Sequence, residues 1–79
     1  MMKRQRPKLT RLGLTIKGFR TLRGFSQEIL AEKCGLDRTY ISLLERGRRN
    51  PSFLNMLRVL LGLNVSAEEF FAKYNGPDT

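Results

Sequence analysis

Residues 27–46 read QEILAEKCGLDRTYISLLER, and this stretch decides the fold. Ala31 comes four positions after Gln27, and Gly35 comes eight positions after it. Two short helices that cross at about 90–120° need a small side chain where their backbones approach, and the turn between them needs a residue that tolerates positive φ. The stretch therefore predicts a helix-turn-helix. Its inward apolar residues form a small core beneath the crossing: Leu30, Cys34, Leu36, Ile41 and Leu44.

The chain on both sides of this stretch also has helical patterns. Apolar residues recur three or four positions apart from Leu9 to Leu22, which is typical of an amphipathic helix, and Gly24 ends this pattern. No stretch shows sustained two-residue alternation, so we expect an all-α chain of five helices. Good N-cap residues begin the four later helices: Ser26, Asp37, Ser52 and Ser66.

The chain is short enough to form a single domain. We expect a flexible basic arm over residues 1–8, a helix-turn-helix DNA-binding domain over residues 9–75 and a tail over residues 76–79. The alternative for the arm is a disordered segment that only adds solubility. A chain of 79 residues has a small core, and Cys34 has no second cysteine to pair with. Oligomerisation is therefore the expected source of additional stability.

The composition favours a polyanionic partner and disfavours catalysis. The net charge of +8 predicts binding to nucleic acid. The chain has no His, a single Cys and no phosphate-cradling glycine loop, so we expect no enzymatic activity, no metal and no cofactor. It also has no long apolar run and no signal-peptide pattern, which predicts a cytoplasmic protein without a membrane partner.

The stretch SQEILAEKCGLDRTYISLLERGRRNPS, residues 26–52, resembles the Xre family of Cro- and phage-repressor-type helix-turn-helix proteins. The resemblance extends from about Ile16 to Phe71 and implies a five-helix bundle of the phage-repressor type, in which the third helix reads the major groove of double-stranded DNA. The portion LDRTYISLLERGRRNPS is similar to the controller proteins of restriction–modification systems. That similarity implies a homodimeric transcriptional regulator with a palindromic operator, for which RNA polymerase is a candidate further partner.

Candidates for reading DNA bases lie on the outward side of the third helix. Arg38 is the first choice, because a guanidinium can donate two hydrogen bonds to O6 and N7 of guanine; the alternative is a solvated charge or a phosphate contact. Leu43 either meets a thymine methyl group or makes a subsidiary core contact. The resemblance adds Arg49 as a base contact. The candidates on the helix itself are Arg38, Thr39, Ser42, Leu43 and Arg46.

Candidates for contacting the DNA backbone flank the same helix. The resemblance places Gln27 at a phosphate-contacting position, where the N-terminus of the second helix favours an anion. Tyr40 either contacts the backbone through its phenol or packs against the second helix, and the alternative for Arg48 and Arg49 is solubility. Phosphate contacts fix the register of a protein on DNA without specifying sequence. The full set is Gln27, Tyr40, Arg48, Asn50 and Ser52.

Two further expectations concern stability and assembly. The resemblance to phage repressors implies an ion pair between Arg20 and Glu45, for which Arg23 is a competing partner. The C-terminal part holds more apolar residues than one short helix needs, which predicts a homodimer interface; the alternative is ordinary core. The interface residues would be Met56, Leu60, Leu63, Val65, Phe70 and Phe71.

Two functions of the same fold class stay open beside the controller protein. One is an antitoxin-type repressor, which binds a protein toxin as well as its own operator. The other is a phage-type repressor.

Overall fold

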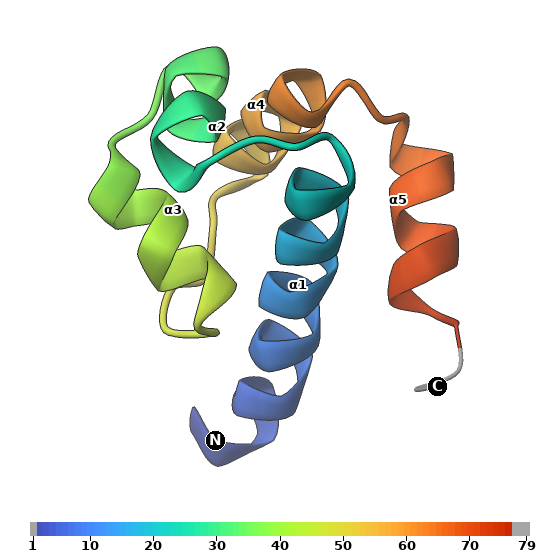
Figure 1. The fold of residues 1–79 in the computed structure, drawn as a ribbon. Helices are drawn as coiled ribbons and strands as arrows, with labels where there is room; N and C mark the ends of the chain where they lie inside the picture. The colour runs from blue at the N-terminus through green and yellow to red at the C-terminus, as the bar shows by residue number, and fades with distance from the viewer. Residues whose placement is uncertain (1, 77–79) are drawn as a thin grey trace.

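The computed structural model describes residues 2–76, with side chains from residue 6 onward. Within this range the chain forms five helices and no strand, which confirms the predicted fold class (Figure 1). None of the described helices is both long and apolar enough to cross a membrane. The helices are α1 (Met2–Leu22), α2 (Gln27–Cys34), α3 (Arg38–Glu45), α4 (Phe53–Leu63) and α5 (Ala67–Tyr74).

The predicted N-cap residues precede the four later helices. The hydroxyls of Ser26, Ser52 and Ser66 each accept a hydrogen bond from the backbone N–H three residues further on. This bond satisfies one of the amides that a helix leaves without a partner in its first turn. Asp37 occupies the N-cap position of α3 without such a bond, so its carboxylate acts there through the helix dipole alone.

The N-terminal segment differs from the sequence expectation. We expected a flexible arm over residues 1–8 and a helix from Leu9, whereas residues 2–8 belong to α1. Pro7 lies inside this helix, where its ring removes one backbone hydrogen bond and crowds the carbonyl four residues earlier. Residue 1 of the expected arm and residues 77–79 of the expected tail lie outside the described residues.

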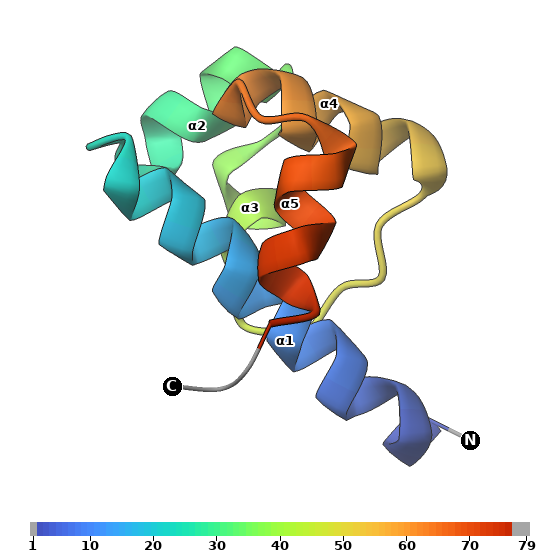
Figure 2. The same cartoon turned by 90° about the vertical axis from the view of Figure 1, so that its right-hand side faces the viewer.

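The helices are arranged around α1. In Figure 1, α3 lies on one side of α1 and α5 on the other, while α2 and α4 pack together across one end. Figure 2 shows the N-terminal turns of α1 projecting beyond the other helices. The core lies where the five helices meet, and its fully buried side chains are Ile16, Leu30, Ile41, Leu44, Val59, Leu63 and Phe70.

The helix-turn-helix has the predicted packing. Ala31 is buried, and Gly35 caps α2 with φ of 71°, a left-handed conformation that glycine adopts without steric cost. The side chains of Leu30, Cys34, Ile41 and Leu44 are buried, and Leu36 packs against them half-buried.

A close approach of α1 to α3 fixes the position of α3. A Cβ atom at Gly13 would overlap the carbonyl oxygen of Leu44 and lie 2.6 Å from that of Glu45. No other residue fits there without moving α3 away from α1. The glycine costs up to about 1 kcal/mol in helix propensity relative to alanine, and the tight packing of α3 offsets that cost.

Candidate nucleic-acid interface

The outward side of α3 carries the predicted base-reading residues. Arg38 and Thr39 are exposed in its first turn, and Ser42 and Leu43 are half-buried one turn later. Ile41 and Leu44 are buried in the core. The opposite side of α3 is therefore the one that faces solvent. A helix with this exposure has the dimensions to enter the major groove with its N-terminal residues at the base edges.

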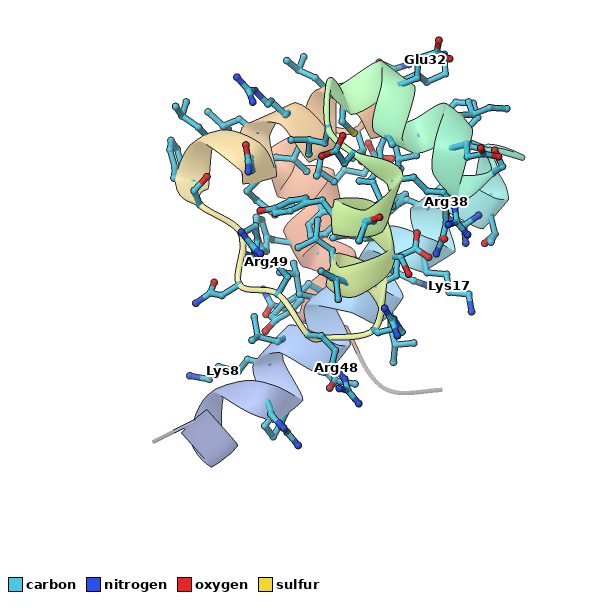
Figure 3. The ribbon with its side chains drawn as sticks, turned by 90° about the vertical axis from the view of Figure 1, so that its left-hand side faces the viewer. Lys8, Lys17, Glu32, Arg38, Arg48 and Arg49 are labelled. Atoms are coloured by element: carbon cyan, nitrogen blue, oxygen red, sulfur yellow. The ribbon has the colours of Figure 1, made fainter. Side chains whose placement is uncertain are left out.

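Positive charge surrounds α3. Figure 3 looks onto this helix and shows Arg38 at one of its ends, Arg48 and Arg49 on the loop that follows it, and Lys17 and Lys8 on α1. We call the set Lys8, Lys17, Arg38, Arg48 and Arg49 the basic face. The acid labelled in the same view, Glu32, lies at the opposite end of the molecule from the α1 N-terminus. Asp37 is an exposed acid at the N-cap of α3, so positive charge predominates around this helix without being alone, and this balance favours a polyanion.

Sequence reasoning missed Lys17. Its place follows from two residues that contact α3, Gly13 and Arg20, because positions 13, 17 and 20 lie on one side of a helix of 3.6 residues per turn. The spacing was available in the sequence. The contact of α1 with α3 at Gly13 was not, and without it Lys17 is one exposed lysine among several.

Tyr40 links the core to the basic face. Its ring is half-buried against the core, and the guanidinium carbon of Arg49 lies 5.1 Å from the ring centroid. A cation at this distance is attracted by the negative face of the ring. Tyr40 thus packs against the core and positions Arg49 beside α3, and its contact with the DNA backbone stays a prediction.

The residues that follow α3 are accessible. Arg46 is exposed at the C-cap of α3, and its Nε donates to the carbonyl oxygen of Ser42 at 3.4 Å. Arg48, Asn50 and Ser52 are exposed on the loop. The Ser52 Oγ accepts from the Asn55 N–H at 3.1 Å, so its own O–H proton is available to an external acceptor.

A buried ion pair holds α1, α2 and α3 together behind this face. The structure brings Arg20 and Glu45 together, with Arg20 Nη2 3.1 Å from Glu45 Oε1 and Nε bonded to Oε2. Arg20 Nη1 also donates to the carbonyl oxygen of Phe25 at 2.7 Å. Gln27 Nε2 donates to Glu45 Oε1 at 2.9 Å, which ties the N-terminus of α2 to the end of α3. Gln27 thus has a structural role that the sequence did not predict.

Arg23, the competing partner for Glu45, has a different role. Its Nε donates to the carbonyl oxygen of Leu63 at 2.9 Å, and its Nη2 donates to that of Asn64 at 3.0 Å. These carbonyls end α4, where helix geometry leaves them without intrahelical partners and where a cation also interacts favourably with the helix dipole.

The predicted dimer interface needs correction. Leu60, Leu63, Val65 and Phe70 are buried within the chain itself, because α5 folds back onto α1 and stacks Phe70 on Phe19 with ring centroids 5.7 Å apart. Met56 is half-buried against the same core, and of the six predicted residues Phe71 alone is exposed. The exposed apolar residues of α4 are others: Phe53, Leu54, Leu57 and Leu61.

The family of the chain follows from this architecture and a direct match. The model of the helix-turn-helix family matches residues 16–70, a span from the middle of α1 into α5 that includes all of α2 and α3. The chain belongs to the helix-turn-helix family. Within this family it is similar to a hypothetical transcription factor from Neisseria meningitidis, with 45% identity over 56 residues that cover 71% of this chain and 53% of that protein. The chain thus spans about half the length of this relative.

Two solved structures of restriction–modification controller proteins are similar over most of the chain. C.AhdI from Aeromonas hydrophila is 41% identical with a TM-score of 0.77, covering 80% of this chain and 96% of that one. The C.Esp1396I tetramer, solved in complex with its natural 35 base-pair operator, is 40% identical with a TM-score of 0.81, covering 85% of this chain and 88% of that one. These matches confirm the resemblance that residues 26–52 indicated.

Proposed function

We propose that this protein is a sequence-specific DNA-binding transcriptional regulator that acts as the controller of a restriction–modification system. The basic face around α3 is the observation that carries the proposal, because it places five cations around a helix whose polar side is open to solvent. The operator complex formed by C.Esp1396I supports it through 40% identity and a shared fold. A regulator of this kind works beside its DNA in the cytoplasm and needs no catalytic group or cofactor.

In this proposal α3 lies in the major groove. Arg38 donates to a guanine from the first turn, and Thr39, Ser42, Leu43 and Arg46 offer further contacts along the helix. Arg49, positioned over the Tyr40 ring, reaches a base or a phosphate at the groove edge. The contacts with the DNA backbone that fix the register come from Gln27, Tyr40, Arg48, Asn50 and Ser52.

We propose that the regulator is a homodimer that assembles through α4. Phe53, Leu54, Leu57 and Leu61 form an exposed apolar set on that helix, with Phe71 of α5 also exposed, and sets of this kind mark protein interfaces. A twofold dimer would place two α3 helices about 34 Å apart, which matches half-sites one turn of DNA apart. RNA polymerase is a further candidate partner once the dimer is bound beside a promoter.

Selection of bound duplexes from a random DNA pool tests this function. At about 0.15 M salt, where non-specific binding is weakened, we expect enrichment of an inverted repeat with half-site centres about ten base pairs apart. Salt-sensitive binding without enrichment of any sequence would contradict the proposal. The alternative hypothesis of an antitoxin-type repressor would then be tested by copurification of a small partner protein.

A further inference from the structure

The N-terminal turns of α1 carry positive charge that takes no part in the DNA contacts proposed for α3. Five basic residues lie within the first eleven positions, and the first acid of the chain is Glu28. Figure 2 shows this end of α1 extending past the bundle. Arg6 and Lys8 are exposed, and among residues 6–76 neither side chain has an ion-pair or hydrogen-bond partner. Their charge is therefore available to a ligand.

Contacts with α5 set the direction of this segment. The Tyr74 hydroxyl donates to the carbonyl oxygen of Lys8 at 3.3 Å, and Arg11 Nη1 donates to the carbonyl oxygen of Tyr74 at 3.1 Å. The guanidinium carbon of Arg11 also lies 6.0 Å from the Tyr74 ring centroid. The last turn of α5 therefore holds α1 where it leaves the bundle, so residues 2–8 continue in a defined direction.

The segment leaves the bundle beside the loop that follows α3. Lys8 lines a shallow pocket together with Asn50 and Ser52 of that loop. At the other end of the loop the backbone of Gly47 packs on α1, since a Cβ atom there would lie 2.8 Å from the Thr10 Cα. Figure 3 shows Lys8 and Arg48 at the same end of the basic face. Positive charge thus continues from the loop onto α1.

We propose that Arg6 and Lys8 of α1 bind the phosphate backbone of the DNA that flanks the base pairs read by α3. This inference rests on the proposed function, because α3 must lie in the major groove for α1 to lie along the adjoining backbone. The length is suitable: residues 2–8 rise about 10 Å along the helix axis, and phosphates of one strand recur about every 3.4 Å along the duplex. The segment spans about three phosphates and adds affinity without sequence preference.

Arg6→Gln/Lys8→Gln is the test variant, and Lys33→Gln/Lys73→Gln is its control. Both remove two exposed positive charges. Lys33 lies in the last turn of α2, with its Nζ 4.9 Å from the Phe25 ring centroid, and Lys73 lies in the last turn of α5, a helix across α1 from α3 in Figure 1. The Kd is measured as a function of salt concentration on three duplexes. They are a random-sequence duplex, the selected operator with flanking base pairs, and the same operator trimmed to the site. Circular dichroism verifies folding, and Lys8→Gln alone is the milder variant.

We expect the slope of log Kd against log salt on the flanked operator and on the random-sequence duplex to become shallower by about 2 per protomer for the test variant, and by about 1 for Lys8→Gln. The control keeps the wild-type slope, and on the trimmed operator the difference in slope between the test variant and the wild type becomes smaller.

Equal slopes for the test and control variants would overturn the inference. So would a change in slope on the trimmed operator as large as that on the flanked operator. A change in sedimenting mass with no change in slope would also overturn it, because the segment would then contact protein. If no operator is selected, the proposed function fails, and the random-sequence duplex still tests whether Arg6 and Lys8 contact phosphates.

Discussion

The guanidinium of Arg20 lies against the carboxylate of Glu45, and the two side chains are 12% and 3% exposed. The pair connects residues 25 positions apart and joins α1 to the C-terminal end of α3. Because both charges are almost removed from water, each depends on the other, and on Gln27 and the Phe25 carbonyl, for its remaining hydrogen bonds.

Removing one partner of this pair should destabilise the protein strongly. We expect Arg20→Met to lower the free energy of unfolding by about 3 kcal/mol, because it leaves a buried carboxylate to which, among the described side chains, Gln27 alone still donates a hydrogen bond. Urea denaturation measures the loss. The neighbouring Arg23→Met, which removes bonds to two helix-end carbonyls, should cost about 1 kcal/mol. The double variant Arg20→Met/Glu45→Met should lose less free energy of unfolding than the sum of the losses in Arg20→Met and Glu45→Met. A loss equal to that sum would contradict a coupled pair.

Two glycines of α1 should respond in opposite directions to alanine. At Gly13 an added Cβ overlaps the Leu44 carbonyl oxygen, so Gly13→Ala should push α3 away and lower the melting temperature by several degrees. At Gly18 nothing lies within 4 Å of the added atom, so Gly18→Ala should stabilise the helix by up to about 1 kcal/mol. Thermal unfolding of both variants, followed by circular dichroism, tests the approach of α1 to α3.

Arg38 and Arg48 should differ in what they contribute to DNA binding. Replacing Arg38 by Ala should flatten base preference at one position in each half-site, with a loss of about 1–3 kcal/mol on the preferred sequence. Replacing Arg48 by Ala should weaken binding to all sequences equally and make the salt dependence shallower. Repeating the DNA selection with each variant separates these effects. Uniform weakening by Arg38→Ala would make that residue a phosphate contact.

The exposed face of α4 should control assembly. Leu61 is 80% exposed, so Leu61→Gln costs the monomer little while placing an amide in the proposed dimer interface. We expect a weaker dimer in sedimentation equilibrium and weaker binding to the full inverted repeat. Leu22, at the end of α1, is 73% exposed and supplies the matched control Leu22→Gln. The same dissociation constant for both variants and the wild type would place the interface elsewhere.

The thiol of Cys34 should make stability depend on alkaline pH. Burial raises its pKa from 9.0 to about 11, because desolvation disfavours the thiolate. The unfolded thiol ionises first, so the stability that the neutral form contributes is complete below pH 9.0 and is lost as the pH rises towards about 11. Wild type should therefore lose more free energy of unfolding than Cys34→Ala over this range, and parallel curves would argue against a buried neutral thiol. Slow alkylation of the native thiol is the second expected result.

Local patterns were enough to predict most of the fold. The serine caps, the glycine turn at Gly35 and the apolar spacing of residues 27–46 each act within one or two helical turns, so one stretch of sequence contains all the interacting partners. The outward residues of α3 follow from the same periodicity, because a helix that buries Ile41 and Leu44 must expose Arg38 and Thr39.

Features that depend on contacts between distant helices were not predictable in this way. An apolar pattern shows that Leu63 and Phe70 avoid water, but it does not say whether they do so inside one chain or between two; α5 settles this by packing on α1. The choice of Arg20 over Arg23 as the partner of Glu45 depends on which turn of α1 faces α3. The position of Lys8 beside Asn50 likewise depends on where α1 meets the loop. Each of these contacts joins residues more than twenty positions apart in the sequence, and only packing in three dimensions specifies which distant residues meet.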